Sequence, residues 1–247
     1  MRFVRFTTKN LEPSFGWVMN DRVGLIEGDL FGEYRRKEAN YDLDAIHLLP
    51  PVLPSKIICV GRNYVEHARE LGNPVPESPL IFLKPPSSVV GDHEKIEIPP
   101  QSHQVEHEAE LVVVIGKRGR WVTLENANQY LFGYTVGNDV TARDLQARDG
   151  QWTRAKGFDT FCPIGPWIDT EADIADSLIT CRVNGELRQM ASTREMVFSI
   201  PQLIAFVSSV MTLLPGDLIF TGTPSGVGLL KENDVVEVEI EGIGRLS

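Results

Sequence analysis

Cysteine is scarce in this sequence. Only three occur among 247 residues, Cys59, Cys162 and Cys181, and they lie far apart, form no CxxC pair and leave one over if two bridge. A disulfide framework needs an even set of cysteines, and a thiolate zinc site needs them paired. The pattern therefore predicts three reduced thiols packed in the interior.

Positive charge and long apolar runs are also in short supply. The formal net charge is -10, which repels nucleic acid and anionic membranes, so neither is an expected partner. No apolar run approaches the ~20 residues of a membrane span. The N-terminal MRFVRFTTKN lacks the apolar core of a secretory signal. We expect a cytoplasmic protein in which local cations hold any anionic ligand.

The chain is long enough for one large domain with a small appendage. Its 42% hydrophobic and 23% charged residues are ordinary for a globular protein, so a core needs no disulfide or structural metal. Short alternating runs fill the first 50 residues, with a hairpin turn at Asn20-Asp21, and the proline-rich LLPPVLPSK at 48–56 is a connector. These features predict a small N-terminal β-rich domain over 1–50 and a main domain over 51–247.

Strands outnumber helices in the main domain. Apolar runs at KIICVG, LIFLK, AELVVVIG, FGYTVGN and CPIGPWI predict strands, and Asn184-Gly185 joins two alternating runs as a hairpin. A helix is predicted over 199–211, with Pro201 in its first turn. Because helices do not alternate regularly with strands, a doubly wound sheet is disfavoured. The predicted fold class is β-rich α+β.

Carboxylates precede the most apolar strand. In VEHEAELVVVIG, Glu108 and Glu110 are two residues apart, so on a strand they point to the same face. Asp139 follows another apolar strand, and three carboxylates without a cysteine or histidine cluster suit Mg2+, Mn2+ or Ca2+ rather than zinc. Such a site leaves room for water or substrate on the ion. The alternative is a solvated strand end, with Asp139 paired to Arg143.

The segment GRNYVEHARELG, residues 61–72, contains a candidate proton-transfer pair. Asn63 and Glu66 resemble the start of a capping box, and the helix that follows places His67 and Glu70 one turn apart. A carboxylate that orients an imidazole raises its basicity, so His67 is a candidate general base. The alternative is a surface helix with an incidental pair.

Two later segments contain candidate ligand contacts. The polar run 139–156 places Arg143 and Gln146 one turn apart on a predicted helix, and Lys156 follows a DGQ stretch suited to a lid. The alternative is a solvated charged loop. The glycine-rich TGTPSGVG, residues 221–228, has backbone N–H groups suited to holding a carboxylate. It lacks the lysine of a nucleotide phosphate loop, which argues against nucleotide binding.

Taken together, these segments resemble the fumarylacetoacetate hydrolase superfamily over about residues 54–246. The motifs occur in the order GRNYxxHAxE, FLKP, HEAELVVVIG, GYTVGNDVTARDLQ, WTRAKGFDTFCPIGP, VNGELRQ, PGDLIFTGTPSGVG and EGIGRL. Their joint occurrence is far more specific than any one of them. The resemblance implies a metal-binding domain with a mixed β-roll fold, a variable small N-terminal domain and a homodimer.

The resemblance also implies roles for individual residues. Fumarylacetoacetate hydrolase itself has a further ligating aspartate where the GRNY segment has Asn63, so a site with three protein ligands for Mg2+ or Mn2+ is implied. The implied ligands are Glu108, Glu110 and Asp139, and the implied water-activating dyad is His67 with Glu70. Lys156 resembles the active-site lysine and Gln146 the lid glutamine, while the implied substrate contacts are Arg62, Arg143 of the DxxxRD pattern and Thr223.

The reaction implied by the resemblance begins with a small anionic 2-oxo or 2,4-dioxo acid that chelates the metal. The metal then stabilises an enolate, and His67 activates water for carbon–carbon bond hydrolysis of the acylpyruvase type. The same enolate supports two alternatives. They are isomerisation of 2-hydroxyhepta-2,4-diene-1,7-dioate, as in 5-carboxymethyl-2-hydroxymuconate isomerases, and decarboxylation or tautomerisation of oxaloacetate. A metal- or ligand-binding protein without catalysis is the remaining alternative.

Overall fold

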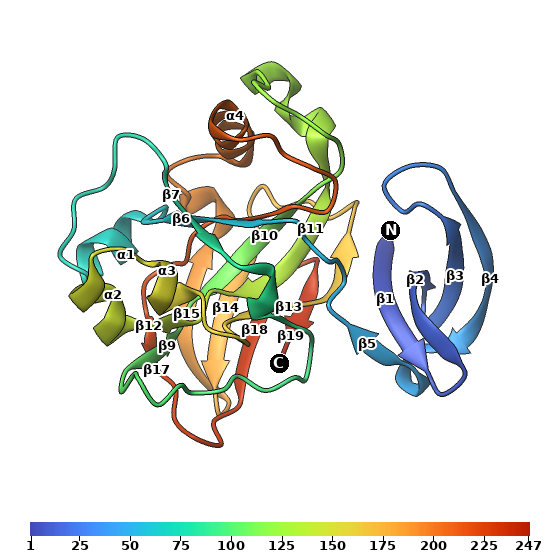
Figure 1. Ribbon diagram of the computed structural model, residues 1–247, viewed down its shortest axis with the longest axis horizontal. Helices are drawn as coiled ribbons and strands as arrows, with labels where there is room; N and C mark the ends of the chain where they lie inside the picture. Colours follow the sequence, from blue (N-terminus) through green and yellow to red (C-terminus); the bar gives the residue numbers. More distant parts are fainter.

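The computed structural model describes residues 1–247 and shows a small β unit beside a larger body (Figure 1). The small unit contains the strands β1 (Arg2–Thr8), β2 (Leu11–Met19), β3 (Arg22–Gly28), β4 (Tyr34–Asp42) and β5 (His47–Leu49). Asn20 takes the left-handed conformation of a tight hairpin turn (φ 54°), at the predicted place between β2 and β3. The predicted N-terminal β-rich unit is confirmed.

The small unit continues the main sheet of the body. β1 pairs antiparallel with β13 (Cys162–Asp169), so both belong to one 12-stranded sheet. The sheet then runs through β11 (Leu131–Asn138), β10 (Ala109–Ile115), β16 (Leu218–Phe220), β6 (Ile57–Gly61) and β7 (Leu80–Lys84). β6 pairs parallel with β16, and β8 (Val89–Val90) parallel with β13, whereas the other pairs are antiparallel. The sheet is therefore mixed.

Two smaller sheets complete the body. One contains β14 (Leu178–Val183), β15 (Glu186–Ser192), β18 (Val236–Ile240) and β19 (Gly244–Leu246). The other contains β9 (Val105–His107), β12 (Thr141–Ala142) and β17 (Gly228–Leu229). The predicted Asn184-Gly185 hairpin joins β14 to β15, and both turn residues have positive φ, as a type I′ turn requires.

Helices are few and short. They are α1 (Val65–Glu70), α2 (Arg143–Asp149), α3 (Thr153–Lys156) and α4 (Ile200–Val210), with 3-10 turns η1 (Leu43–Ala45), η2 (Pro86–Ser88), η3 (Leu124–Tyr130) and η4 (Thr193–Glu195). α4 lies where predicted, and Gln202 accepts the Ser199 N–H (2.8 Å) in a capping box. Helices α1, α2 and α3 gather at one end of the body, next to β9 and β12 (Figure 1).

None of these helices combines the length and the apolar character that crossing a membrane demands.

The start of α1 differs from the prediction. Tyr64 is its N-cap, without a side-chain capping bond. Asn63 is fully buried instead, donates to the carbonyl oxygens of Phe198 (3.1 Å) and Thr221 (2.7 Å), and accepts the N–H of Phe198 (2.7 Å). The predicted capping role of Asn63 is wrong because buried main-chain groups of two other segments take its hydrogen bonds.

β10 is buried on both faces, as its unbroken apolar run predicts. Successive strand residues point to opposite faces, and here each face meets its own core. The larger core lies between the main sheet, the four-stranded sheet and α4. The apolar residues of β10 divide between the two cores, with Leu111, Val113 and Ile115 in the larger and Val112 and Val114 in the other.

Candidate metal and substrate site

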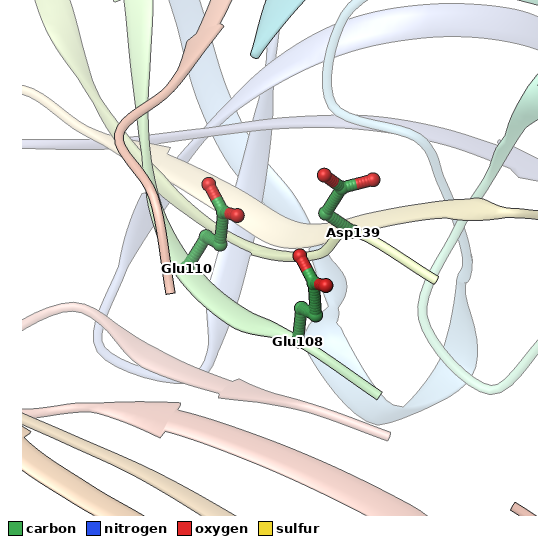
Figure 2. Close-up of side chains that lie close together, drawn as sticks. All are labelled: Glu108, Glu110 and Asp139. Atoms are coloured by element: carbon green, nitrogen blue, oxygen red, sulfur yellow. The ribbon is translucent and has the colours of Figure 1, made fainter. Parts of the chain in front are cut away.

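Three carboxylates converge where β9, β10 and β11 meet, and Figure 2 shows the three side chains close together. Glu110 is on β10, Glu108 lies in the short break between β9 and β10, and Asp139 directly follows β11. Asp139 N–H donates to the Glu108 carbonyl oxygen (2.9 Å), and Glu108 N–H donates to Asn138 Oδ1 (2.9 Å). The strand is therefore interrupted at Glu108, yet the two glutamates face the same space.

The three carboxylates are buried and close together. The exposed fraction is 4% for Glu108 and 1% for both Glu110 and Asp139, which excludes a solvated strand end. One ligand oxygen from each residue lies within 4.8 Å of the others. A buried, all-oxygen set of this size fits a hard divalent ion such as Mg2+ or Mn2+.

Two lysines bind the carboxylates, one that precedes them in the sequence and one that follows them. Lys156 Nζ donates to Glu108 Oε2 (2.8 Å) and Asp139 Oδ2 (2.7 Å). Lys84 Nζ donates to Asp139 Oδ1 (2.5 Å) and to the carbonyl oxygen of Val140 (3.2 Å). Both ammonium groups are almost fully buried, so they act as fixed positive charges beside the site.

Lys84 is a site residue to which sequence reasoning gave no role. It ends β7 and is 1% exposed. The signal was present in FLKP, because a lysine at the end of an apolar strand needs a carboxylate partner if it is buried. The partner, Asp139, is 55 residues away along the chain and could not be read from local pattern.

Arg143 on α2 binds acceptors of the protein. Its guanidinium donates to Glu106 Oε2 (2.7 Å), Glu108 Oε1 (2.6 Å) and Gln146 Oε1 (2.7 Å). The alternative pairing of Arg143 with Asp139 is therefore wrong. The predicted helix places Arg143 and Gln146 one turn apart, and the arginine fixes the direction of the glutamine amide.

Charges around the site move the carboxyl pKa values in opposite directions. Burial alone would raise the pKa of Glu108, but Lys156 and Arg143 outweigh it and hold that pKa below its ordinary value. Burial, followed by the charges of Asp139 and Glu108, raises the pKa of Glu110 well above its ordinary value. Burial would lower the pKa of Lys156, but Asp139 and Glu108 raise it. Glu110 is thus the carboxylate with the least cationic support.

His67 and Glu70 form the predicted pair on α1. His67 Nδ1 is 3.2 Å from Glu70 Oε2, and Glu70 Oε1 accepts the N–H of Gly226 (3.0 Å), so the carboxylate is held from two sides. His67 is only 4% exposed, which excludes an incidental surface pair. With Nδ1 held by Glu70, Nε2 is the ring nitrogen left for proton transfer.

One cavity of about 270 Å³ gathers the predicted residues. Phe82 and Trp152 form its apolar side, with ring centroids 5.2 Å apart in an edge-to-face contact. Glu70 lies behind His67 rather than on the wall. The other nine predicted residues line the cavity, and they are Arg62, His67, Glu108, Glu110, Asp139, Arg143, Gln146, Lys156 and Thr223.

The glycine-rich loop 221–228 holds carboxylates of the protein itself. Gly222 N–H donates to Glu110 Oε2 (2.7 Å), while Gly226 N–H is the donor to Glu70 described above. Thr223 lines the cavity, and its hydroxyl donates to the carbonyl oxygen of Ala109 (3.0 Å). The loop therefore orients one candidate metal ligand and one member of the dyad, and its contact with a substrate carboxylate stays a prediction.

Arg62 differs from the lysines and the arginine around the three carboxylates because its guanidinium has no carboxylate partner. Lys84, Lys156 and Arg143 are all ion-paired. Arg62 directly follows β6, is half-buried, and has a left-handed backbone (φ 59°). A non-glycine residue in the left-handed conformation is strained, and such residues cluster at ligand sites. The conformation of Arg62 therefore supports a binding role.

Comparison with known proteins identifies relatives along the whole chain. Residues 56–247 match the family Fumarylacetoacetate (FAA) hydrolase C-terminal, and residues 1–51 match Rv2993c-like, N-terminal. A 5-carboxymethyl-2-hydroxymuconate delta-isomerase from Mycobacterium smegmatis superposes with a TM-score of 0.93 and 42% identity, covering 100% of this chain and 97% of that chain.

Two further relatives are informative about chemistry. The mitochondrial oxaloacetate tautomerase FAHD2B of Bos taurus is 48% identical over 209 residues, which is 80% of this chain and 67% of the relative. Fumarylpyruvate hydrolase from Pseudomonas aeruginosa, solved in complex with Mn2+ and pyruvate, has a TM-score of 0.73 and 38% identity, covering 80% of this chain and 88% of that chain.

These matches confirm the predicted β-rich α+β fold with its small N-terminal domain, and they confirm the predicted resemblance. A relative with Mn2+ in its structure agrees with a divalent ion at the three buried carboxylates. The chain therefore belongs to the fumarylacetoacetate hydrolase family of enzymes.

Proposed function

We propose that this protein is a divalent-metal-dependent isomerase or tautomerase of small dicarboxylic 2-oxo acids or their 2-hydroxy-dienoic forms. The observation that carries the proposal is a single cavity shared by the three buried carboxylates, His67 of the dyad and the unpaired Arg62. The isomerase and tautomerase relatives support this alternative over the main sequence-based expectation of carbon–carbon hydrolysis.

Glu108, Glu110 and Asp139 are the residues that would hold Mg2+ or Mn2+. When bound, the ion would polarise the keto oxygen of the substrate and stabilise the enolate that isomerisation and tautomerisation share. Lys84 and Lys156 fix the Asp139 carboxylate, and Gly222 N–H fixes that of Glu110. The ligand oxygens are thus oriented before substrate arrives.

The formal charges favour a substrate with two carboxylates. Glu106 and the three candidate ligands face the paired Lys84, Lys156 and Arg143, which leaves one negative charge. A bound divalent ion would change the net charge of the site from one negative charge to one positive charge, and Arg62 would raise it to two positive charges. A dianion neutralises that balance, whereas a monocarboxylate leaves positive charge unpaired in a largely buried cavity.

His67 would carry the proton between substrate atoms. Its Nε2 would take a proton from a carbon next to the keto group and return it to another carbon or to oxygen. Gln146 and Thr223 line the same cavity, and the amide NH2 group of Gln146 and the main-chain N–H of Thr223 are suited to donate to a substrate carboxylate. Phe82 and Trp152 close the apolar side, and excluding water there favours return of the proton over attack by water.

Carbon–carbon hydrolysis is the second candidate function. A dyad that moves a proton can equally activate water, and a fumarylpyruvate hydrolase is among the relatives. The two functions differ in whether a water molecule reaches His67 while substrate is bound.

A product assay tests the proposal. Enol-oxaloacetate, 2-hydroxyhepta-2,4-diene-1,7-dioate and acetylpyruvate are each incubated with Mn2+ or with a chelator and followed by NMR. We expect the two dicarboxylates to give products with the same number of carbons, and we expect chelation to stop the reaction. Cleavage of acetylpyruvate without any isomerisation would assign the hydrolase function instead, and release of CO2 alone would assign a decarboxylase.

A further inference from the structure

Gln189 lies on β15 outside the cavity, and its amide is fully engaged. It is 1% exposed. Its Oε1 accepts the N–H of Ala109 (3.0 Å) and lies 2.9 Å from His107 Nδ1, while its Nε2 donates to Thr223 Oγ1 (2.8 Å) and to the carbonyl oxygen of Pro224 (2.8 Å). An amide has two donor and two acceptor positions, so none is left over.

These partners allow one orientation of the amide. The reverse orientation would set its NH2 group against the Ala109 N–H and its oxygen against the Pro224 carbonyl oxygen. Because Oε1 carries no hydrogen, His107 must donate from Nδ1, and its Nε2 is then a bare acceptor. His107 Nε2 is buried without a hydrogen-bond partner, which costs free energy. The hydrogen bond to the Gln189 amide therefore fixes the tautomer of His107 in spite of this cost.

The loop held by Gln189 also rests directly on β15. A Cβ atom on Gly226 would lie 2.1 Å from the carbonyl oxygen of Arg188, and Gly226 has a φ of 95°. Both facts require glycine at this point. The main chain of β15 and the side chain of Gln189 on the same strand therefore both hold the loop, and together they form a clamp.

This clamp acts on the residues that orient the site. Gly222, next to Thr223, gives its N–H to the candidate ligand Glu110, and Gly226 gives its N–H to Glu70. Thr223 itself receives a hydrogen bond from Gln189 and faces the cavity. One buried amide thus supports a metal ligand, a wall residue and the dyad.

We propose that Gln189 is a positioning residue, which sets the loop 221–228 and, through it, the orientation of Glu110, Thr223 and Glu70. The proposed effect on Glu110 depends only on the geometry of the carboxylate and the loop, and not on the proposed function. The effect on turnover rests on the proposed function. A residue that merely stabilised the fold would lower the melting temperature and leave metal affinity and KM unchanged.

Mn2+ affinity, measured without substrate by electron paramagnetic resonance of the free ion, tests the first effect. Gln189→Leu removes the four hydrogen bonds at nearly the same volume, and Gln189→Glu keeps the acceptor oxygens but loses both donors. We expect Mn2+ to bind about 10- to 100-fold more weakly to both variants. Met190→Ala is the matched control, because Met190 is on the same strand and 59% exposed, and it should bind Mn2+ like the wild type.

A double-mutant cycle tests the second effect. Gln189→Glu, Thr223→Val and the double variant are compared in kcat and KM for oxaloacetate tautomerisation. Because Gln189 acts through Thr223, the double variant should lose about as much as the worse single variant. Additive losses, or wild-type Mn2+ affinity in folded Gln189→Glu protein, would overturn the proposal. If Gln189→Leu fails to fold, the near-isosteric glutamate variant carries the test.

The two readouts separate this proposal from the proposed function. Absence of turnover on every keto acid, with Mn2+ affinity still dependent on Gln189, would count against the function alone.

Discussion

Glu108 and Glu110 are two residues apart and share one site, yet their pKa values shift in opposite directions. Glu108 has ion pairs with Lys156 and Arg143, whereas Glu110 has only the Gly222 N–H. At the scale of the residue, the site therefore contains one carboxylate whose charge the protein does not balance. A divalent ion bound here would gain most from that group and would relieve its repulsion by Glu108.

Glu110→Gln should stabilise the metal-free protein, and increasingly so as the pH rises. Because the folded-state pKa of Glu110 is raised, its contribution to stability is fully present below its ordinary pKa of 4.5 and is lost as the pH rises through the folded-state pKa. Glutamine does not ionise, so urea unfolding with a chelator should show a widening difference from about pH 5 to about pH 8. Mn2+ should stabilise only the wild type, and a pH-independent difference would contradict the assignment.

His67→Ala should lower the isomerisation rate by about 10²- to 10⁴-fold, because it removes the group that transfers the proton. Glu70→Gln should cost less, since an amide can still hydrogen-bond to the imidazole and hold it in place. Rates measured at saturating Mn2+ check this order. Mn2+ affinity should stay at the wild-type value in both variants, and an unchanged rate in His67→Ala would remove the dyad from the mechanism.

Arg62→Gln should raise KM for dicarboxylates by about 10- to 100-fold, since hydrogen bonds to charged groups contribute about 1.5–3 kcal/mol. A monocarboxylate such as acetylpyruvate has no second carboxylate for Arg62 to bind, so its KM should change by about twofold at most. Steady-state kinetics on both substrates give the comparison. Equal losses on the two would show that Arg62 does not contact the distal carboxylate.

At the scale of the element, β10 joins the core to the site. Glu110 lies at the beginning of β10, where the strand pairs with the end of β11 that precedes Asp139. The remaining residues of β10 are buried on both faces. The position of the carboxylates therefore depends on packing several residues away. Small shifts along this strand would move the candidate ligand oxygens relative to one another.

Ile115→Ala, at the far end of β10, should lower the free energy of unfolding by about 2–5 kcal/mol, because it leaves a cavity in the larger core. Leu187→Ala on β15 is the control, since Leu187 is 45% exposed and its loss should cost under about 0.5 kcal/mol. Urea denaturation measures both. Similar values for the two variants would contradict the described core.

Elements with a strong local pattern were predictable from the sequence. The apolar run of β10, the Asn184-Gly185 turn and the helix that became α4 needed only near neighbours. The partners of buried polar groups were not predictable in this way. Asn63 bonds to segments more than 130 residues away, and the salt bridge of Lys84 spans 55 residues. The candidate site was found as a set because family motifs, unlike local patterns, carry such distant pairings.

At the scale of the whole molecule, the N-terminal unit is coupled to the body. β1 extends the main sheet through β13, and Phe3 packs on Phe132 of β11 with ring centroids 5.6 Å apart. Arg2 Nε is 3.2 Å from Asp169 Oδ2 at the same junction. The two parts therefore share a sheet and an aromatic contact. The homodimer and the cytoplasmic location stay predictions.

Phe3→Ala should uncouple the two parts. Phe3 is 3% exposed, and truncating a buried phenylalanine costs about 3–5 kcal/mol. Calorimetry should show one transition for the wild type and an additional, earlier transition for the variant, which hydrogen exchange of the amides of β1 to β5 would locate in the N-terminal unit. Met19→Ala, at a 52% exposed position on β2, should unfold like the wild type. A single transition in Phe3→Ala would show that Phe3 does not carry the coupling.

Lys84, Lys156 and Arg143 give the acidic centre its own internal counterions. For this reason we expect the chain to complete its tertiary structure without waiting for a nucleating ion. Binding of a divalent ion would then be a late exchange, in which the ion would displace ammonium groups from oxygens that they have kept in place.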